Sequence, residues 1–356
     1  MTRFRLRRGW LLIHKWIGLA IAVLVIPVSL SGAALVWRDA LDRAVHPARY
    51  ATSGDRLMPI GAYVAAAEAR LSQGERIARL TLPERGGPVI VAATPAASTL
   101  RSGPPVLTEL YLDPPTARVL DMAYSAAGPV RFLHALHGSL QIPAGWGRPL
   151  VGWPGVALLL SSLSGLWLWW PTVGPWTQGL RWRRRPDANA NLHHLFGFWT
   201  AVPLFVLALT GAWISFPKAF GALVGEGWPR GPDRSRQALA RPVARAALGV
   251  DQAVARALAV APGRAERIDW PTERTPDWSV EVAGGARRTV SVADDAGVAA
   301  LAPERPGQGP VAGWMRRIHE GDGMGPVWRT VIFLSGILSA VLAVTGPIMW
   351  WRTRRR

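Results

Sequence analysis

Residues 13–37 read IHKWIGLAIAVLVIPVSLSGAALVW, and this stretch decides the fold. After His14 and Lys15 it is almost wholly apolar, and a bilayer core requires about 20 such residues of helix. Three other stretches qualify in the same way. We therefore predict a membrane α-helical fold with four transmembrane helices, at residues 10–37, 150–171, 192–216 and 327–351.

The composition excludes several kinds of redox and metal site. The 356 residues include no cysteine, so disulfides, zinc–thiolate sites, iron–sulfur clusters and covalently attached c-type haem are excluded. The formal net charge of +18 first suggests a nucleic-acid-binding protein. However, the positive charge is nearly all arginine and is clustered beside the apolar stretches, where a lipid bilayer explains it better. We predict no nucleic-acid partner.

The arginine clusters predict the orientation in the membrane, because positive charge is enriched in cytoplasmic loops. Arginines crowd the first nine residues, the RWRRR motif of the loop 172–191, and the tail 352–356. Because successive membrane helices cross the bilayer in opposite directions, these three segments lie on the same side of the membrane. We predict a multi-pass protein of the bacterial inner membrane with both termini cytoplasmic. The long segments 38–149 and 217–326 would then be periplasmic.

The membrane stretches repeat in two halves. His14 opens the first and His193 the third, each within an H-x-x-x-G motif, and each lies 18 residues before the glycine of an [ST]-G pair, Gly32 or Gly211. The second and fourth stretches also match each other. Arg148 and Arg329 lie 17 residues before Gly165 and Gly346, which complete two further [ST]-G pairs. Such self-similarity indicates a duplication.

The two long segments repeat as well. Each has one helix-like stretch, IGAYVAAAEARL or VDQAVARALAVAP, followed by strand-like stretches and hairpin turns. We therefore predict two small α+β domains outside the membrane. Neither segment contains an aligned set of carboxylates, a nucleophile or metal-ligand spacing typical of an active site.

Several motifs resemble those of the PepSY-associated transmembrane family. They are YLDPPTARVL at 111–120, LHALHG with GRPLVG, LHHLFGFW with LALTG, and the terminal TGPIMWW. The resemblance implies two duplicated helix–PepSY-like domain–helix halves. It also implies a function in iron metabolism, because the family includes iron-regulated membrane proteins and di-haem ferric-siderophore reductases.

The histidines are the candidate iron ligands, since ionisable groups in membrane spans usually mark function and imidazole is a usual axial ligand of haem. His14 and His193 fall at the cytoplasmic ends of their helices, and His137 and His319 lie before the outer ends of the other two. The two levels are about 27 Å apart by the rise of an α-helix. We predict two haem b groups, an inner one bound by His14 and His193 and an outer one bound by His137 and His319.

Other residues are assigned by their position around these four. His134 competes with His137, His194 competes less well with His193, and His46 is expected on the surface. Gly18 and Gly197 would leave room for a porphyrin. The [ST]-G glycines, at the opposite ends of the membrane stretches, would let the flat cofactor approach there. Interhelical hydrogen bonds and helix packing remain the alternative roles of these histidines and glycines.

Arg148 and Arg329 could pair with haem propionates or an anionic substrate, or anchor the helices at the interface.

The predicted function is electron transfer across the membrane. The cytoplasmic loop is too short for a flavin or nucleotide domain, so the donor would be a separate cytoplasmic reductase, a reduced flavin or membrane quinol. The acceptor would be a periplasmic ferric siderophore, whose reduction releases iron. The alternative is a non-redox, membrane-anchored PepSY protein with a regulatory role, such as protease inhibition.

Overall fold

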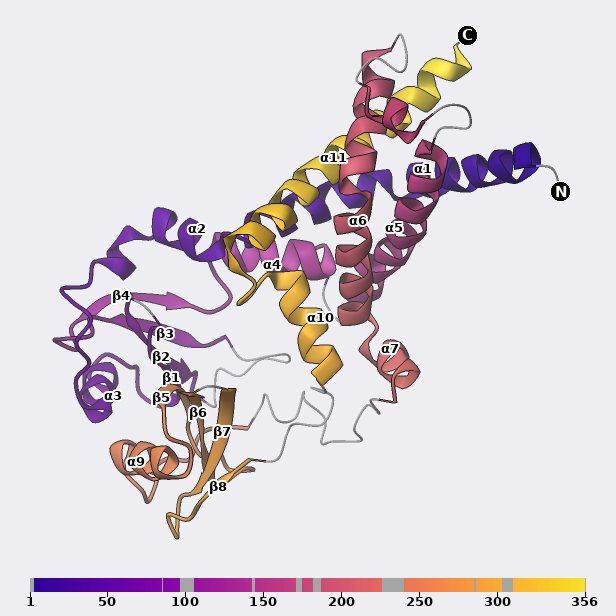
Figure 1. Ribbon diagram of the computed structural model, residues 1–356. Coiled ribbons are helices and arrows are strands. Elements are labelled where there is room, and N and C mark those ends of the chain that lie inside the picture. The colour runs from indigo at the N-terminus through magenta and orange to yellow at the C-terminus, as the bar shows by residue number, and fades with distance from the viewer. Residues whose placement is uncertain are drawn as a thin grey trace. The chain divides into compact units, whose positions relative to one another are not determined.

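The structure is a computed structural model. It describes residues 3–84, 86–96, 106–142, 145–170, 175–181, 187–225, 240–284, 286–302 and 310–355. The chain forms two units, whose elements are labelled in Figure 1. Unit 1 consists of Met1–Arg38, Phe132–Pro229 and Arg305–Arg356, and unit 2 consists of Asp39–Arg131 and Arg230–Glu304.

Unit 1 contains four long helices, α1 (Arg3–Leu35), α5 (Gly147–Trp169), α6 (Ala188–Ser215) and α11 (Gly325–Arg354). All four are long and apolar enough to cross a membrane, which confirms the predicted multi-pass membrane protein. Helix α1 packs against α5 and α11, and α6 packs against the same two helices. Helix α1 begins before its predicted start at residue 10, and α11 continues past its predicted end at residue 351, because arginine is a good helix former and extends each helix beyond its apolar stretch.

Short helices precede two of the long ones. Helix α4 (Pro129–Ser139) carries His137 and leads to α5, while α10 (Pro310–Glu320) carries His319 and leads to α11. The turn after α10 contains Gly321, whose φ of 75° suits glycine. Unit 1 also contains the 3₁₀ helix η3 (Trp176–Leu180) and the short helix α7 (Pro217–Leu223).

Unit 2 repeats one order of elements, a helix followed by four strands. The elements of its first segment are α2 (Arg38–Val45), η1 (Pro47–Tyr50), α3 (Ile60–Glu68), β1 (Arg76–Thr81), β2 (Val89–Thr94), β3 (Thr108–Leu112) and β4 (Val119–Tyr124). Those of its second segment are α9 (Val250–Val260), β5 (Arg264–Asp269), β6 (Asp277–Gly284), β7 (Ala286–Ala293) and β8 (Ala299–Leu301). All eight strands join in one antiparallel sheet, in the order β4-β3-β2-β1-β5-β6-β7-β8.

The single sheet differs from the predicted pair of separate domains. Strand β1 pairs with β5, with Leu80 opposite Ile268. In two separate sheets each of these strands would be an exposed edge, and pairing satisfies the backbone groups of both. Leu80 and Ile268 are fully buried together with Tyr63 and Trp278, so the two segments share one apolar core.

In each segment one carboxylate, the buried Asp113 or the partly buried Asp294, ties the last hairpin to the chain before the helix. Asp113 accepts hydrogen bonds from the backbone N–H and the hydroxyl of Ser53, at 2.7 and 2.6 Å, and from the Thr116 hydroxyl at 2.5 Å. Asp294 accepts from the N–H groups of Ala247 and Leu248, at 2.8 and 3.0 Å. These contacts hold the closing hairpins against the rest of the sheet.

Candidate cofactor-binding site

Four histidines form two pairs in unit 1. The ring centres of His14 and His193 are 6.4 Å apart with an interplanar angle of 79°. Those of His137 and His319 are 5.9 Å apart at 39°. The structure thus brings together the same two pairs that the spacing predicted, and in each pair the two rings come from different halves of the chain.

Each ring lies against the glycine of an [ST]-G pair on a neighbouring helix. A Cβ atom added to Gly32 would lie 2.7 Å from Cε1 of His137, and the corresponding distances are 3.0 Å for Gly211 and His319, 3.1 Å for Gly165 and His14, and 3.4 Å for Gly346 and His193. The group packed directly against each of these glycines is therefore an imidazole ring. At the inner pair, Gly165 and Gly346 also line the cavity into which His14 and His193 face.

At three of the four glycines, Gly165, Gly211 and Gly346, the hydroxyl of the preceding residue contacts Nδ1 of the histidine ring. At the inner pair, Nδ1 of His14 lies 3.0 Å from the Ser164 hydroxyl and 3.1 Å from the Ser161 carbonyl. Nδ1 of His193 lies 2.9 Å from the Thr345 hydroxyl. These contacts connect α1 to α5 and α6 to α11.

The outer pair follows the same plan. Nδ1 of His319 lies 3.0 Å from the Thr210 hydroxyl. Nδ1 of His137 lies 2.8 Å from the Val28 carbonyl, to which the Ser31 hydroxyl also donates a hydrogen bond of 3.0 Å. Both short helices, α4 and α10, are therefore joined to a membrane helix through their histidines.

These partners determine which ring nitrogen carries the proton. A carbonyl oxygen can only accept, so Nδ1 of His14 and of His137 must donate. The Thr345 hydroxyl donates its own hydrogen to the Val341 carbonyl at 2.9 Å, and the Thr210 hydroxyl donates in the same way, so both accept from imidazole. Each ring therefore has its proton on Nδ1, which leaves the lone pair of Nε2 able to bind a metal.

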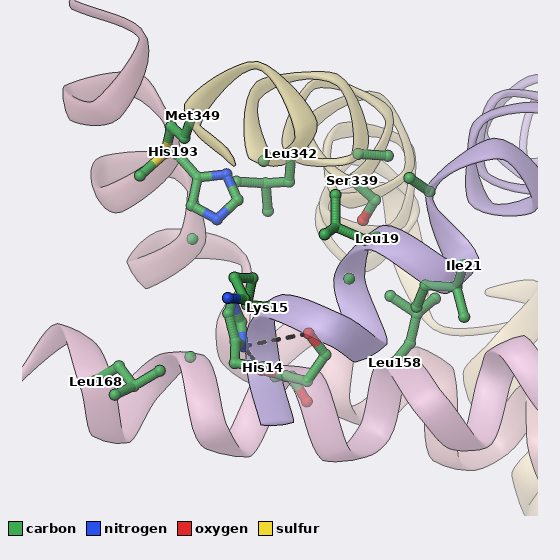
Figure 2. A pocket seen from close by; sticks show the side chains of 18 of the residues that line it. His14, Lys15, Leu19, Ile21, Leu158, Leu168, His193, Ser339, Leu342 and Met349 are labelled. Atoms are coloured by element: carbon green, nitrogen blue, oxygen red, sulfur yellow. Dashed lines mark hydrogen bonds between the residues drawn. The ribbon is translucent and has the colours of Figure 1, made fainter. Parts of the chain in front are cut away.

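A cavity of about 390 Å³ opens beside the inner pair. Figure 2 shows His14 and His193 on facing walls, with their rings directed into the space between them. Gly18 and Gly197 line this cavity, and a Cβ added to Gly18 would meet no atom within 4 Å. The room expected beside these two glycines is therefore present. Its volume lies within the range of about 300–1,000 Å³ that is usual for ligand pockets.

The ligand set fits a planar macrocycle better than a bare metal ion. Among the residues that the structure describes, no group of three or more His, Asp or Glu side chains is placed to hold a metal. A protein-bound zinc ion takes three or four protein ligands, whereas haem supplies its own equatorial nitrogens. Two imidazoles that bind one iron from opposite sides, with bonds of about 2.0 Å, have ring centres roughly 6 Å apart, which is close to both separations in this protein.

The other histidines lie at the edges of these sites. His134 is exposed on α4, so His137, which packs against Gly32, is the residue placed to pair with His319. His194 lines the inner cavity, with its ring centre 6.5 Å from that of His193. His46 lies 3.0 Å from Asp42 in unit 2.

The two arginines before the second and fourth membrane stretches have backbone partners. Arg148 donates a 2.7 Å hydrogen bond to the carbonyl of Ile214 in the last turn of α6. Arg329 donates to the carbonyl of Val36, just past the end of α1, and lies over the ring of Trp37. A cation that binds carbonyls at a helix C-terminus stabilises that end. These contacts favour the predicted alternative of helix anchoring over binding of propionates.

Sequence reasoning missed the roles of several residues. The hydroxyl groups of Ser164, Thr210 and Thr345 orient histidines, and the signal for them was the hydroxyl residue before glycine in all four membrane stretches. Lys15 was also missed. It lines the inner cavity and adds a positive charge to a largely apolar wall.

Comparison with known proteins identifies the family of this chain. A family model described as the PepSY-associated TM region matches residues 11–353, which is nearly the whole chain. No curated protein matches the sequence. The matched range includes all four histidines of the two pairs.

Proposed function

Because the chain belongs to the PepSY-associated transmembrane family, we propose that it is a haem protein that carries electrons across the membrane. One haem b would be held by His14 and His193, and a second by His137 and His319. The observation that carries this proposal is the arrangement of the two pairs, in which every Nδ1 is held by a neighbouring helix while every Nε2 keeps its lone pair.

Bound haem iron supplies a centre that alternates between the ferric and ferrous states and so passes one electron at a time. The residues of the chain supply position and environment for that centre. The contacts on α5 and α11 fix the inner imidazoles, and the apolar walls of the cavity exclude water. Lys15 provides a cation that can pair with a carboxylate of the cofactor.

The proposed path runs from the cytoplasm to the periplasm of the bacterial inner membrane. A separate cytoplasmic reductase, a reduced flavin or a membrane quinol would give one electron at the level of His14 and His193. The electron would leave at the level of His137 and His319, about 27 Å away by the helix rise. There it would reduce one ferric ion in a siderophore to ferrous iron, which hard oxygen ligands hold more weakly.

Substitution of single histidines tests this proposal. We expect purified protein made with ample haem supply to be red and to contain about two haems per chain by pyridine haemochrome assay. His14→Ala and His193→Ala should each remove the inner centre, and His137→Ala and His319→Ala the outer one, so that each variant keeps about half of the haem. His46→Ala is the matched control, because His46 belongs to unit 2 and to neither pair.

The results distinguish the proposal from its alternative. A colourless wild-type protein would contradict the haem proposal and favour the non-redox regulatory role. If His14→Ala and His319→Ala removed the same spectroscopic centre and left the other intact, the assignment of the pairs would be wrong. Transfer of electrons from a reduced donor to an external ferric chelate should fail in all four variants, because loss of either the inner or the outer haem interrupts the path.

A further inference from the structure

We propose that Thr345 is a positioning residue of the inner site, and that its hydroxyl holds His193 in the tautomer that can bind iron. This inference rests on the proposed haem function. Thr345 touches neither the cavity nor the reacting centre, since it is absent from the cavity lining and is only 5% exposed. Its effect on the cofactor would therefore pass through the imidazole ring.

His193 differs from His14 and His137 in its partners. His14 and His137 each have a backbone carbonyl at Nδ1, from Ser161 and Val28. Among the described residues, His193 hydrogen-bonds through the Thr345 hydroxyl alone. Removing that hydroxyl would leave its Nδ1–H without a partner, whereas His14 and His137 each have a carbonyl as acceptor.

The surroundings of Thr345 fit this role. The hydroxyl donates to the Val341 carbonyl at 2.9 Å, which turns its lone pairs toward the ring. Gly346, the next residue, provides the flat surface on which the ring rests. The Thr345 carbonyl accepts a 2.9 Å hydrogen bond from the side chain of Asn189, one turn before His193 on α6. Thr345 thus holds the ring and the turn of α6 that precedes it.

Loss of the hydroxyl should release the ring. A buried N–H without an acceptor is unfavourable, so the imidazole would gain by rotating or by moving its proton to Nε2. Rotation turns the Nε2 lone pair away from the position of the iron, and transfer of the proton to Nε2 occupies that lone pair. Outer partners of metal-binding histidines typically contribute about 10–100-fold to metal affinity. We expect a loss of this size in affinity for the inner haem, with no change at the outer haem.

The experiment compares Thr345→Val, which removes the hydroxyl, with Thr345→Ser, which keeps it. Thr330→Val is the matched control, because Thr330 lies on the same helix as Thr345 and its hydroxyl donates to the Pro326 carbonyl of that helix at 2.9 Å. The first readout uses the full chain made without haem and labelled with 15N-histidine, in which NMR chemical shifts report the tautomer of each ring. The second readout is titration of the same proteins with haem, followed by the absorption and EPR spectra of each centre.

The expected result is a change of tautomer or a mixture at His193 in Thr345→Val, a roughly 10–100-fold weaker inner site, and wild-type behaviour of Thr345→Ser and Thr330→Val. The inference is overturned if Thr345→Val retains the wild-type tautomer and haem affinity, or if Thr345→Ser loses as much as Thr345→Val. If Thr345→Val fails to fold, Thr345→Ala takes its place under the same criteria. A wild-type chain that binds no haem would contradict the proposed function, while the NMR readout would still test whether Thr345 fixes the ring.

Discussion

At the scale of single residues, each histidine ring of the candidate site packs against a glycine. The distance between an added methyl group and the ring differs among the four glycines, so we expect the effect of a Gly→Ala change to differ in the same order. An added methyl group would meet His137 most closely at Gly32 and His193 least closely at Gly346, at 2.7 and 3.4 Å. We expect Gly32→Ala to displace the ring and remove most of the outer haem, and Gly346→Ala to be tolerated. Haem content and the spectrum of each centre measure the effect.

Controls for this series are available within the same unit. Gly9 in α1 and Gly313 in α10 have no atom of another part of the structure within 4 Å of an added Cβ, so their change to alanine should leave haem content unchanged. The distances place Gly211→Ala and Gly165→Ala between the two extremes. Equal loss in all four variants, or the greatest loss at Gly346, would show that steric contact with the ring is not the cause.

The spacing along the helices predicted the depth of each histidine in the membrane, and therefore which other histidine it pairs with. It could not predict the role of Gly165 or Gly346, because position along an axis does not say which atom of a neighbouring helix fills the space. For the same reason the histidines were predicted but their Ser and Thr partners were not. A hydroxyl group in a membrane helix usually bonds to its own backbone, and only the packed structure shows that it also accepts from a ring.

At the scale of elements, the turn between β3 and β4 depends on Asp113. Burial tends to raise the pKa of Asp113, but the hydrogen bonds from Ser53 and Thr116 outweigh it and hold the pKa below its ordinary value. A carboxylate with a lowered folded-state pKa contributes its stability in full above the unfolded value of about 3.9 and loses it as pH falls through the folded value. Asp113→Ala should therefore destabilise unit 2 at pH 7 by about 1–3 kcal/mol.

Thermal unfolding in detergent from pH 7 to pH 3 measures this effect. The difference in Tm between wild type and Asp113→Ala should be largest at neutral pH and should shrink below about pH 4. Asp55→Ala is the control, because Asp55 is an exposed acid in the same segment. A difference that stays constant with pH would mean that the loss arises from packing and not from the charge.

The elements of unit 2 were largely predictable, but their pairing was not. Alternation of apolar residues indicates a strand and its buried face, and this holds for β6, in which Trp278, Val280 and Val282 are buried. It does not name the neighbour of an edge strand, because any strand with a free edge and an apolar face satisfies the same pattern. The register of Leu80 with Ile268 is a long-range property of two segments that the sequence keeps far apart.

At the scale of the whole molecule, the arginine clusters predict the direction of the chain in the membrane. The basic ends of α1 and α11 and the short loop before α6 should all be cytoplasmic. A reporter active only in the cytoplasm should be active when fused after Arg356. A reporter active only in the periplasm should be active when inserted after Asp55, an exposed residue before α3. The opposite pattern of reporter activity would reverse the proposed direction of electron flow.

Each pair takes one histidine from each half of the chain, and this affects the order in which the pairs can form during synthesis. His14 and His137 are synthesised early, but their partners His193 and His319 belong to the other half of the chain. The last hydroxyl and glycine to contact a ring, at Thr345 and Gly346, emerge from the ribosome later still. The pair of His137 and His319 cannot form on a nascent chain that stops before α10. Under the proposed function, binding of both haems would therefore serve as a checkpoint for complete synthesis and membrane insertion.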